Sequence, residues 1–254
     1  MPVLSVNGLT KTYCGIPAVD NVSFSISAGQ TLGYLGPNGS GKSTTVKVIA
    51  GLLDPTRGEV LFHGEPIRGI LENYKSRIGY VPEEAHLYGF LTGWEYIEMV
   101  ATLRGLPRER FEEKAAALLE SLAMYSHRHS AIASYSKGMR QRILLIAAVT
   151  HNPELLILDE PFSGLDVTTT LILRKAIKLL GESGKAIFFC SPVIEVVEKI
   201  CSHLLLLRRG KMAAYGTLEE VRQAALEDTF LQLTEDIDAD RIARDFAHAV
   251  RGTH

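Results

Sequence analysis

The sequence predicts an α/β fold with a parallel sheet, an antiparallel β region ahead of it and a helical insertion within it. Three observations lead to this prediction. A glycine-rich loop at residues 36–44 joins a buried apolar strand to a helix. Apolar residues recur at helical spacing through residues 92–150, and strand-like runs then alternate with helical runs over residues 155–207.

Length, net charge and cysteine content restrict the size of the fold and the classes of partner that we expect. The 254 residues suffice for one large α/β unit or two small domains. The net charge of -2 gives no general attraction to nucleic acid or to an acidic membrane surface, so we expect no nucleic-acid partner. Three widely spaced cysteines without a C-x-x-C pair do not predict a disulfide framework or a zinc site. The longest apolar stretch, residues 143–149, is far shorter than the ~20 residues that span a bilayer, so we expect a soluble chain.

The first third of the chain alternates apolar and polar residues, as half-buried strands do. The predicted antiparallel strands are residues 3–6, 22–26 and 59–62. Residues 30–35 read as a buried strand, and residues 45–50 as the helix after the glycine-rich loop. Residues 75–81 predict a further strand that ends at Pro82.

The middle of the chain, residues 91–150, predicts a helical lobe that no flexible linker separates from the rest. After it, strands and helices alternate, which implies a parallel sheet with right-handed crossovers. The predicted strands are residues 155–158, 186–190 and 204–207, and the predicted helices are 171–180 and 193–201.

The C-terminal extension, residues 216–254, predicts two more helices. A capping box from Thr217 to Glu220 opens the first. Ile242, Phe246 and Val250 share one face of the second. We therefore expect a single domain, with residues 1–90 and 151–215 forming its β-rich and α/β parts.

The glycine-rich loop fits the phosphate-binding pattern G-x-x-x-x-G-K-[ST]. Its residues are Gly36, Pro37, Asn38, Gly39, Ser40, Gly41, Lys42, Ser43 and Thr44. Glycines allow several backbone N–H groups to point at one place, the helix start adds partial positive charge, and Lys42 adds a full charge. A plain glycine turn would not need Lys42 followed by Ser43, so the loop predicts a polyphosphate site.

Two carboxylates, Asp159 and Glu160, follow the buried strand 155–158. Ligands of parallel sheets lie outside the carboxyl ends of strands, so these acids and the phosphate loop are expected to meet. Asp159 would hold Mg²⁺ together with the Ser43 hydroxyl, and Glu160 would orient or deprotonate the attacking water. The alternative is a pair of surface acids in a turn, but an apolar strand delivers them to the predicted phosphate edge.

These motifs, in this order, resemble the nucleotide-binding subunits of ATP-binding cassette (ABC) transporters over nearly the whole chain. Residues 135–142, Y-S-K-G-M-R-Q-R, resemble the signature L-S-G-G-Q-x-Q-R with Lys137 and Met139 as departures. Residues 163–166 resemble the loop that follows the catalytic glutamate, and Tyr13 resembles the aromatic residue that stacks on adenine. The resemblance implies a P-loop NTPase core with an antiparallel β subdomain and a helical subdomain.

The resemblance also implies a mechanism with ATP and Mg²⁺ at the interface of two such subunits. Lys42 and Glu160 would be catalytic, while Ser136 and Gly138 would contact the nucleotide of the opposite subunit and Asp166 would bridge the two sites. Ser136 can equally be a plain helix N-cap. The wording of the motifs resembles the branch that serves bacterial exporters of drugs, lipids, polysaccharides or peptides. That branch implies a separate integral-membrane subunit, a homodimer as the simplest pairing, and a place at the cytoplasmic face of the cell membrane.

Two positions depart from the family pattern. Glu83 matches a glutamine that senses Mg²⁺ and γ-phosphate, and we expect the carboxylate to retain a place beside the metal and the hinge role. Pro192 stands where the family has a histidine that contacts the γ-phosphate. Ser191 as N-cap and Pro192 as first helical residue explain why proline fits there. His203 is expected at the opposite edge of the sheet and does not replace the missing imidazole, so hydrolysis is expected to be slow.

Two other functions remain open at this point. A non-transport ATPase, such as a ribosome-associated one, resembles two cassettes joined by a charged linker, and this sequence has one cassette and no such linker. A regulatory ATP-binding subunit with little catalysis is favoured by Pro192 and opposed by the intact Lys42, Asp159 and Glu160. The transported cargo leaves no mark in the sequence.

Overall fold

The computed structural model describes residues 1–224, 241 and 244–246, and these residues form two sheets surrounded by helices. The first sheet is antiparallel, in the order β2-β1-β4-β5. Its strands are β1 (Leu4–Tyr13), β2 (Ile16–Ile26), β4 (Arg57–Phe62) and β5 (Glu65–Pro66). The strands predicted in this region are confirmed, but β1 and β2 form a longer hairpin than the alternating apolar residues indicated.

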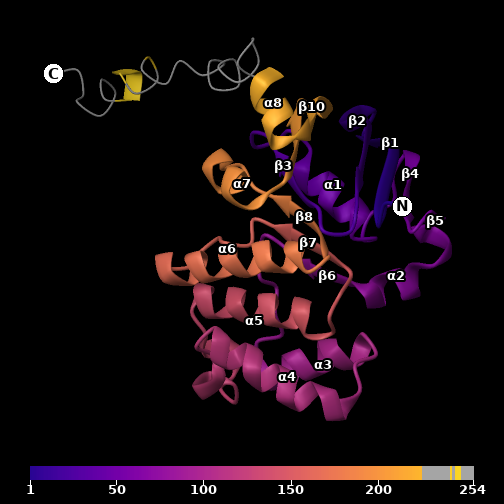
Figure 1. The fold of residues 1–254 in the computed structure, drawn as a ribbon. Helices are drawn as coiled ribbons and strands as arrows, with labels where there is room; N and C mark the ends of the chain where they lie inside the picture. The colour runs from indigo at the N-terminus through magenta and orange to yellow at the C-terminus, as the bar shows by residue number, and fades with distance from the viewer. Residues whose placement is uncertain (225–240, 242–243, 247–254) are drawn as a thin grey trace.

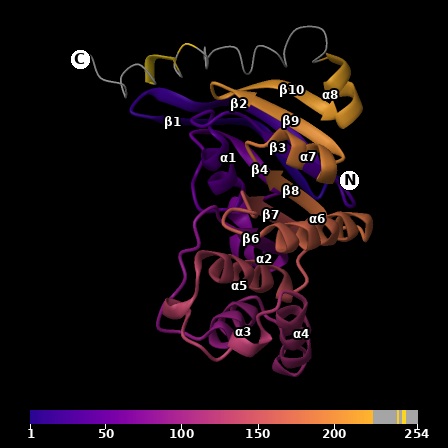
Figure 2. The same ribbon diagram turned by 90° about the vertical axis from the view of Figure 1, so that its left-hand side faces the viewer.

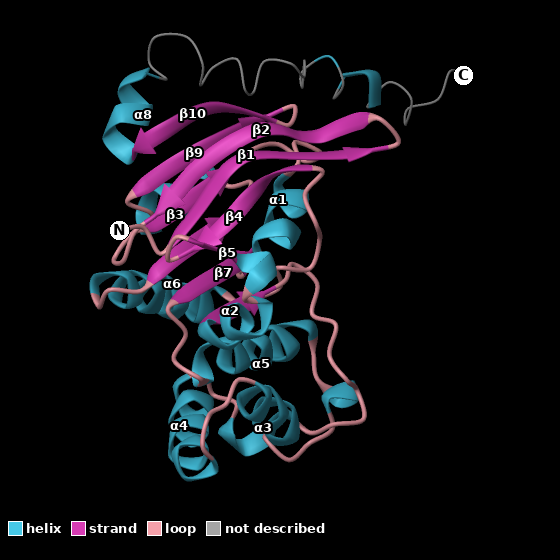
Figure 3. Ribbon diagram, turned by 90° about the vertical axis from the view of Figure 1, so that its right-hand side faces the viewer, coloured by secondary structure: helices cyan, strands magenta, loops and turns pink. Residues whose placement is uncertain are grey.

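The second sheet has the order β10-β9-β3-β8-β7-β6, and both sheets are drawn in magenta in Figure 3. Its strands are β3 (Thr31–Leu35), β6 (Ile78–Val81), β7 (Leu155–Asp159), β8 (Ala186–Cys190), β9 (His203–Arg208) and β10 (Lys211–Thr217). All neighbours are parallel except β10, which runs antiparallel to β9. The predicted parallel sheet is therefore confirmed, and it gains one antiparallel edge strand.

Helices pack against the second sheet and also form a separate helical region beyond α5 (Figure 1). They are α1 (Lys42–Ile49), α2 (Leu71–Arg77), α3 (Gly93–Leu103), α4 (Arg108–Ser121), α5 (Lys137–Thr150), α6 (Val167–Glu182), α7 (Ile194–Ile200) and α8 (Leu218–Ala224), with 3-10 turns at Ile67–Gly69, Tyr125–His127 and Ile132–Ser134. Successive side chains of a strand point to opposite faces, so each parallel strand feeds two cores. Leu156 and Leu158 of β7 join the core under α5, α6 and α7, whereas Leu155 and Ile157 join the core between α1 and the antiparallel sheet.

The helical region lies at the end of the molecule away from α8 and β10, as Figures 1 and 2 both show. Helix α5 connects this region to the sheet, because it packs against α3 and α4 on one side and against β6 on the other. Gly79 of β6 allows this close approach, since an added Cβ there would lie 2.2 Å from the Ala148 carbonyl oxygen. The residues of α5 from Ile143 to Ala148 are consequently buried all round.

One predicted boundary is wrong, and one strand was not predicted. The strand predicted at 75–81 begins only at Ile78, because the preceding residues form α2. Tyr74 holds that helix in place: its side chain is fully buried and its hydroxyl donates to the Ile49 carbonyl oxygen. The edge strand β10 was not predicted, because its residues are mostly exposed and lack a continuous apolar run.

Of the two helices predicted in the C-terminal extension, the first is confirmed. Helix α8 follows the expected capping box: Thr217 N donates to a Glu220 carboxylate oxygen at 2.8 Å, and Glu220 N donates to the Thr217 hydroxyl at 3.2 Å. The second predicted helix, through Ile242, Phe246 and Val250, lies for the most part outside the described residues. Among the described residues, no helix combines the length and the apolar content needed to cross a bilayer.

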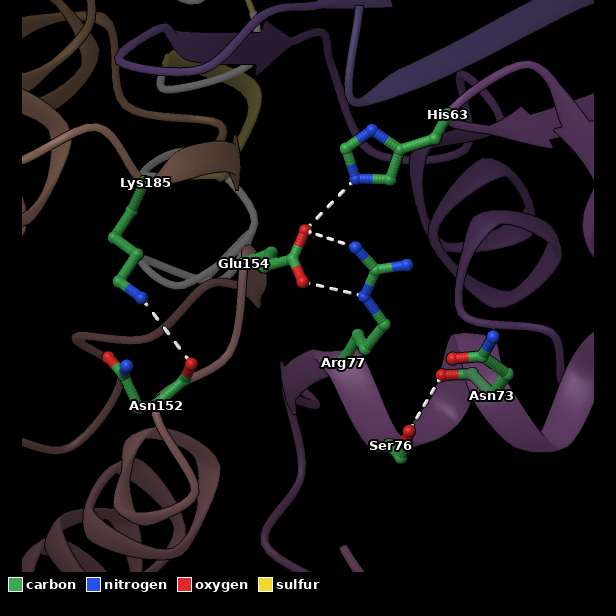
Figure 4. Close-up of polar contacts among 7 residues, drawn as sticks. All are labelled: His63, Asn73, Ser76, Arg77, Asn152, Glu154 and Lys185. Atoms are coloured by element: carbon green, nitrogen blue, oxygen red, sulfur yellow. Dashed lines mark hydrogen bonds and ion pairs between the residues drawn. The ribbon is translucent and has the colours of Figure 1, made fainter.

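An ion-pair clasp joins the two sheets at the amino ends of the parallel strands (Figure 4). The Arg77 guanidinium donates to both oxygens of Glu154, at 2.6 and 2.7 Å, and His63 lies 3.0 Å from one of them. The Glu154 backbone N–H donates to the Arg77 carbonyl at 2.8 Å. The clasp thus connects the end of β4, the end of α2 and the segment before β7, on the side of the sheet opposite the phosphate loop.

Candidate functional site: a phosphate-binding cavity

Four strand ends of the parallel sheet converge on one cavity of about 440 Å³. The phosphate loop follows β3, Glu160 follows β7, Pro192 follows β8 and Glu83 follows β6. The cavity is lined by Ala18, Asn38, Gly39, Gly41, Lys42, Ser43, Thr44, Glu83, Glu160 and Pro192. The structure therefore brings the loop and the catalytic candidates together at the carboxyl edge, where α/β sheets bind their ligands.

The phosphate loop needs glycine at its two ends. An added Cβ at Gly36 would lie 2.5 Å from the Leu207 carbonyl oxygen, and one at Gly41 would lie 2.3 Å from the Ala18 carbonyl oxygen. Gly41 also has a φ of 106°, in the left-handed region that favours glycine, and it is the N-cap of α1. This conformation leaves the unpaired N–H groups of the first helical turn at the cavity, where an anion can accept hydrogen bonds from them.

Lys42 and Ser40 are donors buried inside the loop. The Lys42 side chain is only 6% exposed, and its ammonium donates to the carbonyl oxygens of Gly36 and Pro37, at 2.8 and 3.1 Å. The Ser40 hydroxyl is buried and has no hydrogen-bond partner. A buried donor without a partner is costly, so the Ser40 hydroxyl fits a site that is completed by an anionic ligand. The Lys42 ammonium has three N–H donors and two carbonyl partners, so one donor is left for the same ligand.

Asp159 and Glu160 both experience the charge of Glu83, and Glu160 also experiences that of Asp159. Burial raises the pKa of the Asp159 carboxyl, and the charge of Glu83 raises it further. A hydrogen bond with Cys190 and the charge of Lys42 lower it, but by less. Burial and the charge of Glu83 also raise the pKa of Glu160. Three carboxylates near Lys42 and Lys47 leave an excess of negative charge, which a divalent cation would offset.

The donor set fits Mg²⁺ held jointly with phosphates. Among residues 1–224, 241 and 244–246, no group of three His, Cys, Asp or Glu side chains could hold a metal ion without other ligands. Mg²⁺ in nucleotide sites uses one or two carboxylates and takes its remaining ligands from phosphate and water. Ser43, Asp159 and Glu83 are the candidate protein ligands, and all three have oxygen donors.

The segment after β8 differs from the prediction. Helix α7 begins at Ile194 with Val193 as N-cap, so the predicted capping by Ser191 and the first-turn place for Pro192 are wrong. The Ser191 hydroxyl instead accepts from the Val193 N–H at 3.1 Å, which closes a tight turn before the helix. Pro192 is consequently exposed at the cavity. His203 pairs with Leu32 at the beginning of β3, which places it at the opposite edge of the sheet, as expected.

The remaining candidate residues do not line the cavity of their own chain. Ser136 is the N-cap of α5 and accepts from Met139 N at 3.2 Å. An added Cβ at Gly138 would lie 2.9 Å from the Gly164 carbonyl oxygen. Tyr13, at the end of β1, is 48% exposed.

Asp166 is the N-cap of α6 and belongs to a dense polar cluster. It accepts from the backbone N–H and the hydroxyl of Thr169, at 2.9 and 2.7 Å, and from the Arg142 guanidinium at 2.5 Å. These bonds lower the pKa of Asp166 well below its usual range. Arg142 lies within the signature segment, but no sequence pattern predicts a role for it.

Two other residues of the site carry no sequence signal. Ala18 reaches the cavity because β2 passes beside the phosphate loop, and its carbonyl oxygen forms part of the wall next to Gly41. Cys190 lies opposite Asp159 in the register of β7 and β8 and is fully buried. Tertiary packing creates the first contact and strand register the second, and no motif marks either residue.

Comparisons with known proteins agree with this geometry. The family described as ABC transporter matches residues 19–163. The ABC-type transporter ATP-binding protein EcsA of Bacillus subtilis is 35% identical, over 93% of this chain and 98% of that protein. The linearmycin resistance ATP-binding protein LnrL of the same organism is 34% identical, over 91% of this chain and 75% of that protein.

Solved structures show the same fold. One, described as the structure of an ATP-binding subunit of an ABC transporter, has a TM-score of 0.86 and 30% identity, and it covers 92% of this chain and 100% of that one. The dimeric ABC transporter cassette MJ0796 has a TM-score of 0.78 and 26% identity over 85% of this chain and 98% of that one. The cavity, the family match and these relatives together show that the chain belongs to the ABC transporter family and is an ATP-binding subunit with ATPase activity.

Proposed function

We propose that the chain binds ATP with Mg²⁺ in the cavity at the carboxyl edge and hydrolyses it at the interface with a second copy. The observation that carries this proposal is the common cavity of the phosphate loop and Glu160. Lys42 and the N–H groups of α1 hold the β- and γ-phosphates, and Glu160 orients the attacking water or takes its proton. Bound Mg²⁺ would neutralise developing phosphate charge, with Ser43, Asp159 and Glu83 as its protein ligands. Tyr13 stacks on the adenine.

The second copy completes the site. Ser136 and Gly138 lie at the start of a 14-residue helix and outside the cavity of their own chain, which leaves them available to a nucleotide held by a partner. Asp166 is connected to the same helix because it accepts a hydrogen bond from Arg142. MJ0796 is described as dimeric, and also as a dimeric post-hydrolysis state bound to ADP and Pi. We propose the same pairing here, as a homodimer that closes on ATP and opens after its cleavage.

A separate integral-membrane subunit is the proposed recipient of this motion, at the cytoplasmic face of the cell membrane. A hollow of about 580 Å³ lies between α2 and the end of α3, lined by Leu71, Glu72, Lys75, Ser76, Val100, Leu103 and Arg104. Close in sequence to Glu83, the exposed rings of Tyr88 and Phe90 pack 5.8 Å apart. The hollow and the two exposed rings are surfaces that suit a short cytoplasmic helix of such a subunit. The resistance named for LnrL favours export as the direction.

Slow hydrolysis is a second part of the proposal, and it rests on Pro192. The residue lines the cavity beside Glu160 but offers neither a donor nor a charge. Removal of one preorganised contact to developing charge costs about 10²–10³ in rate. A regulatory subunit with little catalysis is the competing candidate favoured by the same residue. The intact Lys42 and Glu160 favour a working ATPase.

The test compares ATP turnover of the chain, together with its membrane subunit, with turnover of the Pro192→His variant. The exposed position tolerates the substitution, so the variant is expected to fold. We expect turnover to rise by about 10²-fold with little change in ATP affinity. Fast turnover of the unaltered protein with no gain from histidine would refute the slow-site proposal. Complete absence of turnover in both would favour the regulatory subunit.

A further inference from the structure

The backbone at Glu160 has an unusual conformation. Its φ is 45°, in the left-handed region that residues with a Cβ rarely adopt. Two backbone bonds hold it: Glu160 N donates to the Cys190 carbonyl oxygen at 3.0 Å, and Ser163 N donates to the Glu160 carbonyl oxygen at 3.0 Å. Such conformations persist only where the surroundings determine them strongly, so the direction of the Glu160 side chain depends on what holds residues 160–163.

Gln141 of α5 supplies a further hold on this segment. Its side chain is 2% exposed, and its amide donates to the Pro161 carbonyl oxygen at 3.1 Å. Among the described residues, this is the one side-chain hydrogen bond to residues 160–162. A buried amide is costly unless it is bonded, and an apolar side chain would fill the same volume without that demand. The geometry of the bond, rather than packing alone, therefore explains an amide at this position.

The first two turns of α5 also contact the rest of the same loop. The Lys137 side-chain carbons lie 3.0 to 3.1 Å from the position of a Cβ on Gly164, and the Arg142 guanidinium is 2.5 Å from Asp166. Loop 160–166 is thus attached to α5 at its beginning, through Gln141, and at its end, through Arg142. The start of α5 and the loop form one contiguous unit.

We infer that Gln141 is a positioning residue for hydrolysis: its amide fixes the Pro161 carbonyl and so keeps the Glu160 carboxylate in the cavity. The inference rests on the proposed function, in which Glu160 handles water and the start of α5 contacts the partner's nucleotide. Gln141 then connects these two regions within one chain. A shift of α5 toward the partner's nucleotide moves the carbonyl that follows Glu160.

Thr150 provides a matched control on the same helix. It is also fully buried, and its hydroxyl donates within the helix to the Ile146 carbonyl oxygen at 2.6 Å, with no contact to the loop. Thr150→Val removes this buried hydrogen bond at nearly constant side-chain volume. Gln141→Met likewise removes the hydrogen bond to Pro161 at nearly constant volume. Gln141→Leu serves as a second variant if the methionine variant folds poorly.

The experiment measures ATP turnover with the membrane subunit, and amide hydrogen exchange of the nucleotide-free chain. We expect Gln141→Met to lower kcat about 10–100-fold with KM changed less than about twofold, because the reacting group is displaced while the phosphate loop is intact. Exchange at the Glu160 and Ser163 amides should accelerate about tenfold, and Thr150→Val should change neither quantity. A kcat within about twofold of the unaltered protein, or equal losses in both variants, would overturn the inference.

Hydrogen exchange separates this inference from the proposed function. If the unaltered chain turned over no ATP, the catalytic proposal would fail, but exchange at Ser163 would still report whether Gln141 holds the loop. Unchanged exchange in Gln141→Met and Gln141→Leu would reject the positioning role even in a fully active ATPase.

Discussion

Gly36 shows how little space the phosphate loop leaves around its backbone. The Leu207 carbonyl of β9 lies within 2.5 Å of the position that a Cβ would occupy, and the buried Ser40 hydroxyl lies within 2.7 Å. The loop can therefore keep its shape only if this residue has no side chain. The Leu207 oxygen belongs to the backbone and cannot rotate away, so the clash is relieved only by a shift of the loop or of β9.

The Gly36→Ala variant should accordingly lose ATP binding. We expect at least a tenfold weaker affinity for ATP–Mg²⁺ in a direct binding titration, because the displaced loop no longer aims its N–H groups at one point. Gly69→Ala is the control, since a Cβ there meets nothing within 4 Å and no positive φ is involved. Equal affinities of the two variants would show that the fit at Gly36 is not required.

His151 is a second residue whose surroundings predict a measurable effect. It lies at the C-terminal end of α5, with Nε2 2.9 Å from the Ile78 carbonyl oxygen. Burial, with smaller contributions from the charges of Arg104 and Lys114, lowers the pKa of His151 from 6.5 to about 4. The unfolded chain therefore binds this proton more readily than the folded chain between pH 6.5 and 4.

The contribution of His151 to stability is fully present above pH 6.5 and is lost as the pH falls toward 4. After a discount for partial exposure, we expect the free energy of unfolding to fall by on the order of 2 kcal/mol from this residue. Urea unfolding of His151→Gln at a series of pH values should show a shallower decline over this interval. The exposed His86 is the control, and an equal change in slope for His86→Gln would refute the assignment.

At the scale of elements, the clasp between Arg77 and Glu154 holds α2, β4 and β7 together. The bond is bidentate and both side chains are partly shielded, with exposed fractions of 37% and 40%. Arg77 also lies over the Phe62 ring, with its guanidinium carbon 4.8 Å from the ring centroid. We expect Arg77→Met to lower the free energy of unfolding by about 1–2 kcal/mol.

Arg68→Met is the comparison for this clasp. Arg68 pairs with Asp54 at 3.1 Å, but the two side chains are 61% and 82% exposed. An exposed pair contributes about 0–1 kcal/mol, so this variant should be nearly neutral in urea unfolding. If both variants had the same small effect, the clasp would be an ordinary surface contact.

The elements that the sequence predicted best are those whose signal is local. Helix α5 begins at Lys137, directly after the serine that the sequence offers as an N-cap, and β8 spans its predicted residues. The first half of the predicted strand 75–81 is helical because Tyr74 is anchored by Ile49, a residue distant in sequence. Strand β10 is formed by pairing with β9, since its own residues are mostly exposed. Tertiary contacts decided these two cases.

On the scale of the whole molecule, the candidate site divides into a part that one chain assembles and a part that it does not. Lys42, Ser43 and Glu160 meet in one cavity, as the edge rule for parallel sheets predicted, and Glu83 and Pro192 line the same cavity. Ser136, Gly138 and Asp166 lie outside it. The family resemblance assigned Ser136 and Gly138 to a partner's nucleotide and Asp166 to a bridge between the two sites, so these roles require an assembly of two chains.

Other features of the site could not be predicted from the sequence. The contact between Gln141 and the Pro161 carbonyl depends on how α5 packs beside the loop, and the proximity of Cys190 to Asp159 depends on strand register. Pro192 was expected to begin a helix, but the Ser191 hydroxyl closes a turn with Val193 and leaves the proline at the cavity. Sequence patterns recognise serine as a helix N-cap. They do not show whether its hydroxyl will instead accept from the Val193 N–H and close a turn before the helix.

Nucleotide-dependent pairing of two chains is the central claim, and the Glu160→Gln variant tests it most directly. This variant should bind ATP–Mg²⁺ but not cleave it, because the amide cannot take the proton of the attacking water. Its mass in solution should be measured by light scattering without nucleotide, with ADP and with ATP–Mg²⁺. We predict a dimer with ATP–Mg²⁺ alone and a monomer in the other two conditions; a monomer that binds ATP–Mg²⁺ without pairing would contradict the account.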